Sequence, residues 1–519
     1  MRRLLPLVAL LGACSIRPQR QAPQQPAPAP TPVPADHSAR PSVPQLDVGV
    51  GRSAERAAIE AIVRAGRDTA QTAADLQHLV DVIGPRLTGS AGLRRANDWT
   101  ATRFREYAAD SAWLEPWKFG QAWERGPMTL ALVAPYRQQL IGSSWAWAPG
   151  TLGPLAGDVV YVDSRSAEDF ARRFAGKLAG KWVMTSRPVP VMNPDAGPTR
   201  ADSVARDSAI RAFFAPPADP DQQRFLASLP TVLAGEKIAG TLRDGAKEFA
   251  LLTMSGSPAR VSPYPAVVVP HETYALFHRL LAAGQPVRIE ANVSNTLTAD
   301  SVTVYNTVAE IRGTEHPDEV VLLGAHLDSW DLGGGATDNA TGSIAVLEAA
   351  RVLRASGVKP KRTIRFVLFS GEEQGLYGSA RYAAAHAAEL PKYQAVLVLD
   401  NGTGRVTGMA LQGRNELYDA WRALFAPVTE LGPFKVREGN KGGTDHLSFL
   451  RYGVPGFNFD QLSRGYDHTH HSQVDTFDHA LAADVQQAAT VMAATAFQLA
   501  NLPALLPRNP EQGTAASTR

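Results

Sequence analysis

The chain has 519 residues, of which 44% are hydrophobic, so it is long enough for about three domains with packed cores. Its 52 Lys and Arg residues nearly balance 50 Asp and Glu residues, which excludes a strongly basic nucleic-acid-binding protein. No apolar run reaches the roughly 20 residues of a membrane-spanning helix, which excludes a multispan membrane protein. The single cysteine, Cys14, excludes an internal disulfide, a Cys-rich zinc module and a Cys-x-x-Cys redox site.

The N-terminal 48 residues are predicted to form an export signal and a spacer. Two arginines, an apolar stretch over residues 4–11 and then Gly12-Ala13-Cys14 are typical of a secretory signal, and they resemble the lipobox of bacterial lipoproteins. We therefore predict a lipoprotein signal peptide over residues 1–14, with Cys14 as the site of lipid attachment. The lipid on Cys14 would be the only membrane contact, and the protein would be an outer-membrane or periplasmic lipoprotein. Ordinary cleavage and secretion is the alternative. Residues 15–48 are rich in Pro, Ala and Gln, which favours an extended spacer.

The next two segments differ in their apolar patterns. Residues 49–129 show helical spacing, for example at Ile59, Ile62 and Val63, and are predicted to be the helical N-terminal part of a catalytic domain. Residues 130–298 contain short apolar runs broken by Gly and Pro, which predict an inserted, mainly β domain. Its expected strands are 129–133, 157–162, 181–184, 250–253, 266–269 and 287–293, with a helix over 273–283 and a long loop over 186–221.

Residues 299–505 are predicted to be the main catalytic domain. Apolar strands are expected over 319–324, 363–369, 395–399 and 456–459, and helices over 341–355 and 484–500. Near-continuous apolar strands between helices predict an α/β fold with a mostly parallel mixed sheet flanked by helices. Residues 506–519 are polar and small, and are predicted to be a disordered tail.

Acidic residues and a histidine follow three successive strands of this predicted sheet. Because ligands bind beyond the carboxyl ends of strands in open α/β sheets, we expect these side chains to meet in one crevice. Histidine and carboxylate ligands suit zinc, and several carboxylates with few histidines suit two cations that share a bridging carboxylate. A second histidine is expected from the loop over 466–476. The side chains are His326, Asp328 and Asp338 after the first strand, Glu372 and Glu373 after the second, and Asp400 after the third.

These motifs carry a family resemblance. His326-x-Asp328, Asp338, Glu372-Glu373, Asp400 and His471-x-x-x-Asp475 occur in the order typical of metallopeptidase family 28, the di-zinc exopeptidases that include bacterial aminopeptidases and glutamate carboxypeptidases. The turn over residues 84–90 is typical of the same family, and residues 326–331 with the following glycines most resemble its carboxypeptidase Q branch. The resemblance implies a zinc exopeptidase (phosphorylase/hydrolase-like) fold, and the insert resembles a protease-associated domain.

The resemblance also implies a role for each residue. Two zinc ions are expected: His326 and Asp400 would bind one, Glu373 and His471 the other, and Asp338 would bridge both. Glu372 would be the general base, and Asp328 would orient His326 through its second ring nitrogen. The oxyanion stabiliser stays open, because His470 stands where a tyrosine is found in relatives. Candidates for oxyanion, substrate or supporting contacts are His470, Tyr466, His468, Asp445 and His446.

We therefore expect an exported or lipid-anchored aminopeptidase or dipeptidase that acts on small peptides and has no nucleic-acid partner. The alternatives are a carboxypeptidase acting on free C-terminal residues, a single-zinc glutaminyl cyclase, and a catalytically inactive receptor-like protein on the same fold. The sequence leaves open the end specificity, the physiological metal, the role of the insert and whether the chain forms a homodimer.

Overall fold

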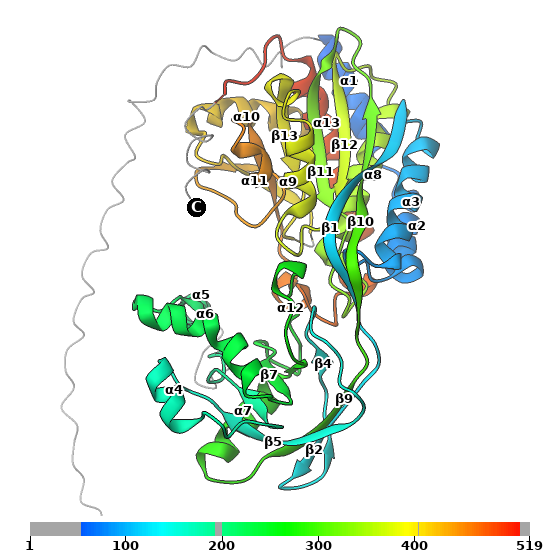
Figure 1. The fold of residues 1–519 in the computed structure, drawn as a ribbon. Helices are drawn as coiled ribbons and strands as arrows, with labels where there is room; N and C mark the ends of the chain where they lie inside the picture. The colour runs from blue at the N-terminus through cyan, green and yellow to red at the C-terminus, as the bar shows by residue number, and fades with distance from the viewer. Residues whose placement is uncertain (1–52, 192–199, 403, 509–519) are drawn as a thin grey trace, which may run out of the picture. The chain divides into compact units, whose positions relative to one another are not determined.

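The computed structural model describes residues 53–191, 200–402 and 404–508 (Figure 1). The predicted signal peptide with Cys14, the spacer and almost all of the predicted tail lie outside these residues. Within them, no helix is both long enough and apolar enough to cross a membrane. The strands form two eight-stranded sheets.

The first sheet is mixed, with four parallel strands at its centre. Its order is β1-β10-β12-β11-β13-β16-β14-β15. The central strands β12, β11, β13 and β16 are parallel, whereas β10 is antiparallel to β12, and β14 is antiparallel to β16. In sheet order, the bounds are Ser111–Glu124, Thr296–Ile311, Arg362–Phe369, His316–His326, Tyr393–Val398, Gly456–Gln461, Val406–Ala410 and Lys435–Arg437.

Helices cover both faces of this sheet. Alternate side chains of its strands point to opposite faces, and on the buried strands both sets are apolar, so both faces are packed against other elements. On β11, Val321 and Leu323 pack with one large apolar cluster, and Val320 and Leu322 pack with another. The first cluster includes helices α1 (Ser53–Ala65), α2 (Ala70–Gln77), α3 (Ala91–Glu106), α8 (Thr341–Ala355), α10 (Tyr418–Phe425) and α13 (Ala482–Asn501). The second includes α9 (Tyr377–Ala385) and α11 (Leu447–Leu450).

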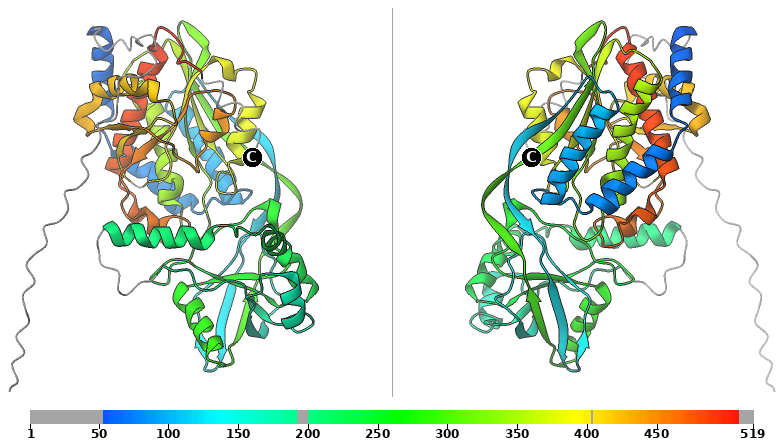
Figure 2. Two further views of the ribbon diagram at one scale, coloured as in Figure 1. Left: turned by 90° about the vertical axis from the view of Figure 1, so that its left-hand side faces the viewer. Right: turned by 90° about the vertical axis from the view of Figure 1, so that its right-hand side faces the viewer.

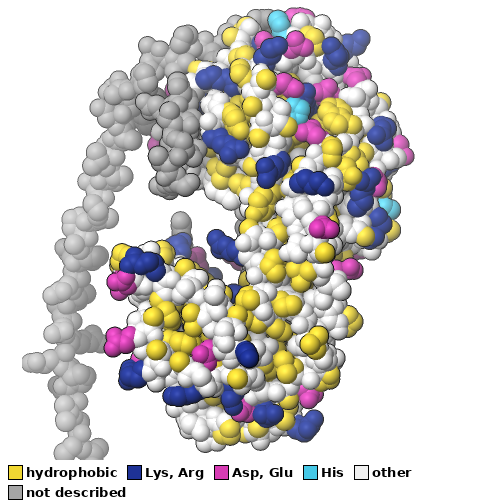
Figure 3. All heavy atoms as spheres, viewed as in Figure 1, with side chains coloured by type: hydrophobic (Ala, Val, Ile, Leu, Met, Phe, Trp, Pro, Cys, Tyr) yellow, Lys and Arg dark blue, Asp and Glu magenta, His cyan; other side chains and the backbone are white. Residues whose placement is uncertain are grey.

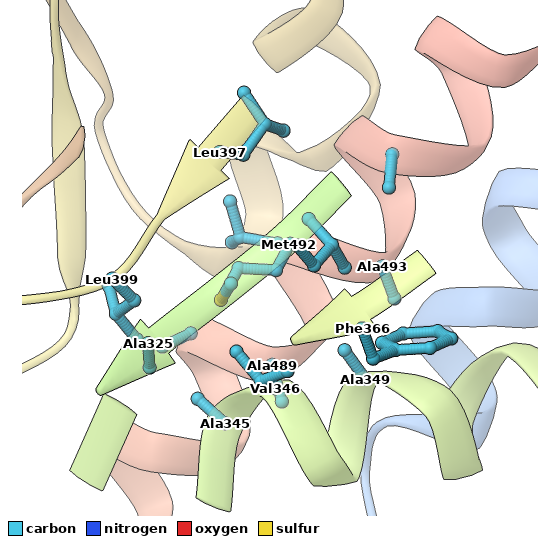
Figure 4. Close-up of a cluster of buried hydrophobic side chains, with 14 of the residues drawn as sticks. Ala325, Ala345, Val346, Ala349, Phe366, Leu397, Leu399, Ala489, Met492 and Ala493 are labelled. Carbon is cyan, nitrogen blue, oxygen red and sulfur yellow. The ribbon is translucent and has the colours of Figure 1, made fainter. Parts of the chain in front are cut away.

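The helices of the larger cluster lie side by side on one face of the sheet in Figure 2. Figure 4 shows part of this core, where Val346 of α8 and Met492 of α13 meet Ala325 and Leu397 of the sheet. Lys and Arg side chains are interspersed with Asp and Glu on the face shown in Figure 3, as expected for a chain with a formal net charge of +2. The predicted α/β class with a mostly parallel mixed sheet is confirmed.

The second sheet is built by residues 128–293, which we call the inserted region. Its order is β3-β2-β9-β5-β6-β7-β8-β4. The bounds are β2 Met128–Ala134, β3 Gln138–Gln139, β4 Ser143–Ser144, β5 Leu155–Tyr161, β6 Trp182–Met184, β7 Gly240–Asp244, β8 Ala266–Val269 and β9 Arg288–Val293. Its helices are α4 Ala167–Arg173, α5 Arg200–Phe214, α6 Pro220–Gly235 and α7 His271–Ala282. The inserted region therefore contains the expected sheet and four helices, of which only the helix over 273–283 was predicted. Its likeness to a protease-associated domain stays a prediction.

Two local predictions within the inserted region are wrong. The expected loop over 186–221 contains α5, whose described side chains, from residue 204 onward, are mostly exposed and so leave little apolar periodicity to detect. The expected strand over 250–253, all of which the structure describes, is not a strand. Its main chain instead bonds to a loop of the first sheet, as described below.

The apolar pattern of the sequence does not predict the long strand β1. It pairs with β10 from Ser111, opposite Glu310, to Glu124, opposite Thr296. These two strands form an antiparallel ribbon that leads from the first sheet into the inserted region and back (Figure 1). The remaining short helical segments are η2 His78–Ile83, η3 Pro258–Arg260, η4 Ala336–Ala340, η5 Leu390–Lys392, η6 Asn415–Leu417, η7 Ala426–Leu431, α12 Tyr466–Thr469 and η8 Phe477–His479.

Candidate metal centre and active site

The predicted ligands meet at the carboxyl ends of the parallel strands. His326 is the last residue of β11, Glu373 follows β12, and Asp400 follows β13. Asp338 lies in η4, just before α8 begins, and His471 lies in the loop after α12. Buried apolar strands bring these polar residues together because each strand ends at the same edge of the sheet.

Asp338 lies between two sets of side chains. Its Oδ1 atom is 3.3 Å from His326 Nε2, and its Oδ2 atom is 3.5 Å from His471 Nε2. On the first side, Asp400 Oδ1 lies 3.5 Å from His326 Nε2. On the second side, Glu373 Oε2 lies 2.9 Å from His471 Nε2. One carboxylate therefore faces both histidines, and each histidine has a further carboxylate beside it.

The chemistry of this cluster fits bound cations. His326 Nε2, Asp338 Oδ2 and Glu373 Oε1 are buried and have no hydrogen-bond partner among the described residues. Polar atoms buried without partners are costly, and nitrogen and carboxylate oxygen donors are the ligands that zinc takes. Donor atoms of His326, Asp338 and Glu373 all lie within 4.8 Å of one another, as do those of Asp338, His470 and His471.

The electrostatics of the two glutamates reflect an excess of buried negative charge. Burial, together with the nearby Asp338 carboxylate, raises the pKa of Glu373 well above its usual value. Burial and the Asp400 and Asp445 carboxylates do the same to the pKa of Glu372. A cluster of this kind is stabilised by positive charge, which a divalent cation supplies.

Asp328 organises the loops around the centre. His326 Nδ1 donates to the main-chain oxygen of Asp328 at 2.9 Å, whereas the Asp328 carboxylate is 3.6 Å from that nitrogen. The carbonyl thus fixes the ring so that Nε2 faces Asp338 and Asp400. The carboxylate of Asp328 accepts from the main-chain nitrogens of Glu372 and Glu373, both at 3.3 Å, and from Thr88 Oγ1 at 2.9 Å.

Two further positioning residues were not assigned roles from the sequence. Asp475 accepts from the main-chain nitrogens of Thr337 at 2.7 Å and of Asp338 at 3.1 Å, so it holds the segment that carries the shared carboxylate. Arg86, in the turn over 84–90, is fully buried and donates to the carbonyl oxygens of Leu327, Gly334 and Gly335, each at 2.7 Å. The motifs contained both residues, but burial of an arginine is a tertiary property.

Gly335 shows why this loop needs glycine. Its φ of +62° lies in the left-handed region, and a Cβ atom there would lie 2.3 Å from the Cβ of Ser329. The loop can therefore pass close to Ser329 and offer its carbonyl to Arg86 only with glycine at this position.

The remaining candidates lie at different depths. His470 stacks on His471 with ring centroids 3.7 Å apart, and burial and the neighbouring His471 lower its pKa to about 4. Tyr466 lies 5.1 Å from the His470 ring, and burial raises the pKa of Tyr466 well above its usual value. His468 is exposed and belongs to neither group of candidate ligands.

Asp445 and His446 are buried. Burial raises the pKa of the Asp445 carboxyl to about 7. The two ring nitrogens of His446 contact Gln412 Nε2, at 2.6 Å, and Thr444 Oγ1, and burial lowers its pKa to about 3. His446 is therefore engaged by its neighbours and lies outside both groups of candidate ligands.

An aromatic cluster backs the centre. The Trp330 ring contacts the His471 ring edge to face at 5.9 Å, and Trp147 of the inserted region contacts Trp330 at 6.3 Å. Both tryptophans are almost fully buried. The inserted region thus packs directly behind a candidate ligand.

A mixed sheet flanked by helices, whose parallel strands end at a cluster of histidines and carboxylates, is an arrangement suited to metal-dependent hydrolases. Comparisons narrow this class. The Peptidase family M28 profile matches residues 306–496. Carboxypeptidase Q of Mus musculus is 30% identical over 438 residues, which cover 83% of this chain and 86% of that protein. The human carboxypeptidase Q is 29% identical, with 83% and 85% covered. The chain belongs to peptidase family M28.

Solved structures agree with this assignment. A peptidase M28 precursor from Shewanella amazonensis is 26% identical, with a TM-score of 0.69 and coverage of 88% of this chain and 99% of that one. An aminopeptidase from Aneurinibacillus sp. strain AM-1 shares the fold at 21% identity, with a TM-score of 0.58 and coverage of 87% and 98%. A zinc aminopeptidase from Bacillus subtilis shares it at 19% identity, with a TM-score of 0.57 and coverage of 82% and 94%.

Proposed function

We propose that this protein is a zinc-dependent exopeptidase, an aminopeptidase or dipeptidase that hydrolyses bonds at the ends of small peptides. The observation that carries the proposal is the shared carboxylate. Asp338 presents one oxygen to each of two histidines, beside buried donor atoms without partners. The zinc dependence named for the Bacillus subtilis aminopeptidase supports the choice of metal.

The proposed centre would hold two zinc ions. His326 and Asp400 would bind one ion, Glu373 and His471 would bind the other, and Asp338 would serve both. When bound, zinc supplies Lewis acidity, which polarises the scissile carbonyl and makes water a stronger nucleophile. Asp475 and Asp328 hold the ligand-bearing segments in place through main-chain nitrogens.

Glu372 is the proposed general base. Its main-chain nitrogen and that of Glu373 bond to the same Asp328 carboxylate, so the two neighbouring side chains start from one fixed turn. We assign Glu373 to the metal and Glu372 to the water. The Glu372 carboxylate would accept a proton from the attacking water and later pass it to the leaving amine.

A carboxypeptidase is the second candidate. It is favoured by the relatives named carboxypeptidase Q, which match over most of both chains. Amino-end specificity is favoured by the aminopeptidases that share the fold.

The proposal also includes export of the protein and its anchoring through a lipid on Cys14.

The test compares peptides with free and blocked ends. Purified protein, with and without added zinc, is offered dipeptides, N-blocked dipeptides and aminoacyl amides. Cleavage of only the compounds with a free amino group supports an aminopeptidase or dipeptidase. Cleavage of only the compounds with a free carboxylate supports the second candidate. No cleavage of any compound by protein that holds two zinc ions contradicts both.

A matched pair of variants tests the general base. Glu372→Gln is expected to lower kcat by about 10²-fold or more while zinc content stays at two per chain. Glu315→Gln changes an exposed glutamate paired with Lys361 and is expected to leave both unchanged. Loss of both zinc ions in Glu372→Gln, or normal turnover, contradicts the assignment.

A further inference from the structure

The inserted region reaches into the loop that carries His471. Lys247 Nζ donates to three main-chain carbonyl oxygens of α12 and the loop that follows it, at 2.7 Å to Asp467, 3.2 Å to His468 and 2.6 Å to His470. An ammonium group has three N–H donors and no acceptor. These three bonds therefore use its full capacity on the main chain immediately before His471.

The residues after Lys247 hold the other side of His471. The main-chain nitrogen of Met254 donates to the His471 carbonyl oxygen at 2.9 Å. Leu252 N donates to Gln473 Oε1 at 2.9 Å, and Gln473 Nε2 donates to the Ala250 carbonyl oxygen at 3.0 Å. We call residues 245–254 the clamp segment, because they bond to the loop both before and after the candidate ligand.

His471 itself requires such support. Its φ of +58° lies in the left-handed region, which is unfavourable for a residue with a Cβ atom. Strained backbone persists where surrounding contacts over-determine it. The bonds from Met254 and Lys247 are contacts of this kind, and both residues belong to the inserted region.

The clamp segment is in turn fixed to the inserted region. Phe249 has a φ of +61°, and its nitrogen donates to Glu272 Oε1 of α7 at 2.8 Å. Ala246 has a φ of +54°, and its nitrogen donates to Asp244 Oδ1 at the end of β7 at 2.9 Å. Asp244 also bonds to His271 Nδ1, at 3.0 Å. The main chain on both sides of Lys247 is thus bonded to the regular elements β7 and α7.

We propose that Lys247 is a positioning residue through which the inserted region completes the His471 side of the metal centre. The ammonium group donates to three carbonyl oxygens and so fixes the main chain before His471. His471 Nε2 thereby stays 2.9 Å from Glu373 and 3.5 Å from Asp338. As far as it concerns zinc, this inference rests on the proposed function. It gives the inserted region a role inside the active site.

The test uses three lysine variants. Lys247→Met removes the charge and the donors but keeps an unbranched stem, Lys247→Arg keeps the charge and donors, and Lys181→Met is the control. Lys181 belongs to the same inserted region, where its Nζ atom lies 2.6 Å from Asp158 at the surface. Gln473→Leu is a fourth variant that removes bonds on the other side of His471.

The first readout is the exchange of main-chain amide hydrogens in residues 466–473 of the metal-free protein. Lys247→Met and Gln473→Leu are expected to accelerate this exchange about tenfold or more, with the control like wild type and Lys247→Arg between them. Unchanged exchange in both variants overturns the proposal. This readout stands even if the protein proves to bind no zinc, in which case the proposed function fails by itself.

The second readout is zinc binding at buffered free concentrations. Lys247→Met is expected to weaken one of two sites by about 10- to 100-fold and leave the other unchanged, as supporting residues of metal ligands do. Its kcat should fall with KM nearly constant, and Lys247→Arg should recover part of kcat. A raised KM with intact zinc affinity overturns the proposal, because it would make Lys247 a substrate contact.

Discussion

Replacement of Arg86 tests whether one buried guanidinium holds the ligand-bearing loop. The side chain is fully buried and donates to four carbonyl oxygens: those of Leu327, Gly334 and Gly335, each at 2.7 Å, and that of Gly84 at 3.1 Å. Burial lowers its pKa to about 10, which still leaves it charged at neutral pH. The change to examine is Arg86→Met, which keeps much of the stem and removes every donor.

The expected loss follows from those four bonds. Hydrogen bonds from a charged donor contribute about 1.5–3 kcal/mol each, so four would give about 6–12 kcal/mol in isolation. Removal of the charge also removes the cost of burying it, which is several kcal/mol and offsets part of this loss. We therefore expect Arg86→Met to lower the free energy of unfolding by about 3–5 kcal/mol, the difference between these two contributions.

The assay is urea unfolding of the metal-free protein, followed by the fluorescence of the tryptophans around the site and by circular dichroism. Arg94→Met is the matched control on the neighbouring helix α3, where Arg94 forms an exposed pair with Asp98 and should contribute less than about 1 kcal/mol. A loss below about 1 kcal/mol for Arg86→Met, equal to that of Arg94→Met, would refute the reasoning.

Two further predictions concern other supports. Asp475→Asn places an amide donor in a position where two main-chain nitrogens need acceptors, so zinc affinity should fall about 10- to 100-fold in a chelator competition. Asp478→Asn, at an exposed position in the following helical segment η8, should leave zinc affinity unchanged. Equal affinities of the two variants would contradict the role of Asp475. Burial lowers the pKa of His386, but Glu115 and Glu389 together raise it by more, so the net shift is upward. The contribution of His386 to stability is therefore complete below about pH 6.5 and disappears as pH rises through the raised pKa. His386→Gln should therefore flatten the fall of unfolding free energy above pH 6.5, and the exposed His479→Gln should not; an unchanged slope in His386→Gln would contradict the ion pairs.

Much of the first sheet could be predicted because its strands are buried on both faces. Their apolar runs end at polar residues, as at His326 after β11 and Asp400 after β13, so both the strand and the functional end are visible in one segment. The helix predicted over 341–355 coincides with α8 for the same reason, since its apolar face packs against the sheet.

Predictions failed where an element's partner is far away in the chain. Strand β1 alternates weakly because much of it is half-buried or exposed, and its pairing with β10 joins residues almost 200 positions apart. Residues 250–253 are apolar enough to suggest a strand, but their main chain bonds to Gln473 and the neighbouring loop. Local pattern does not distinguish a sheet neighbour from a distant loop.

The sequence by itself determined the α/β class, the family and the chemical types gathered at the strand ends, because these depend on local apolar periodicity and on the order of motifs. Tertiary structure alone decided the geometry of the centre. Asp338 faces two histidines from distant segments, Arg86 is buried among carbonyls, and Lys247 of the inserted region bonds to the main chain just before His471. Each of these depends on a distance between atoms that chain folding sets and that no local spacing encodes.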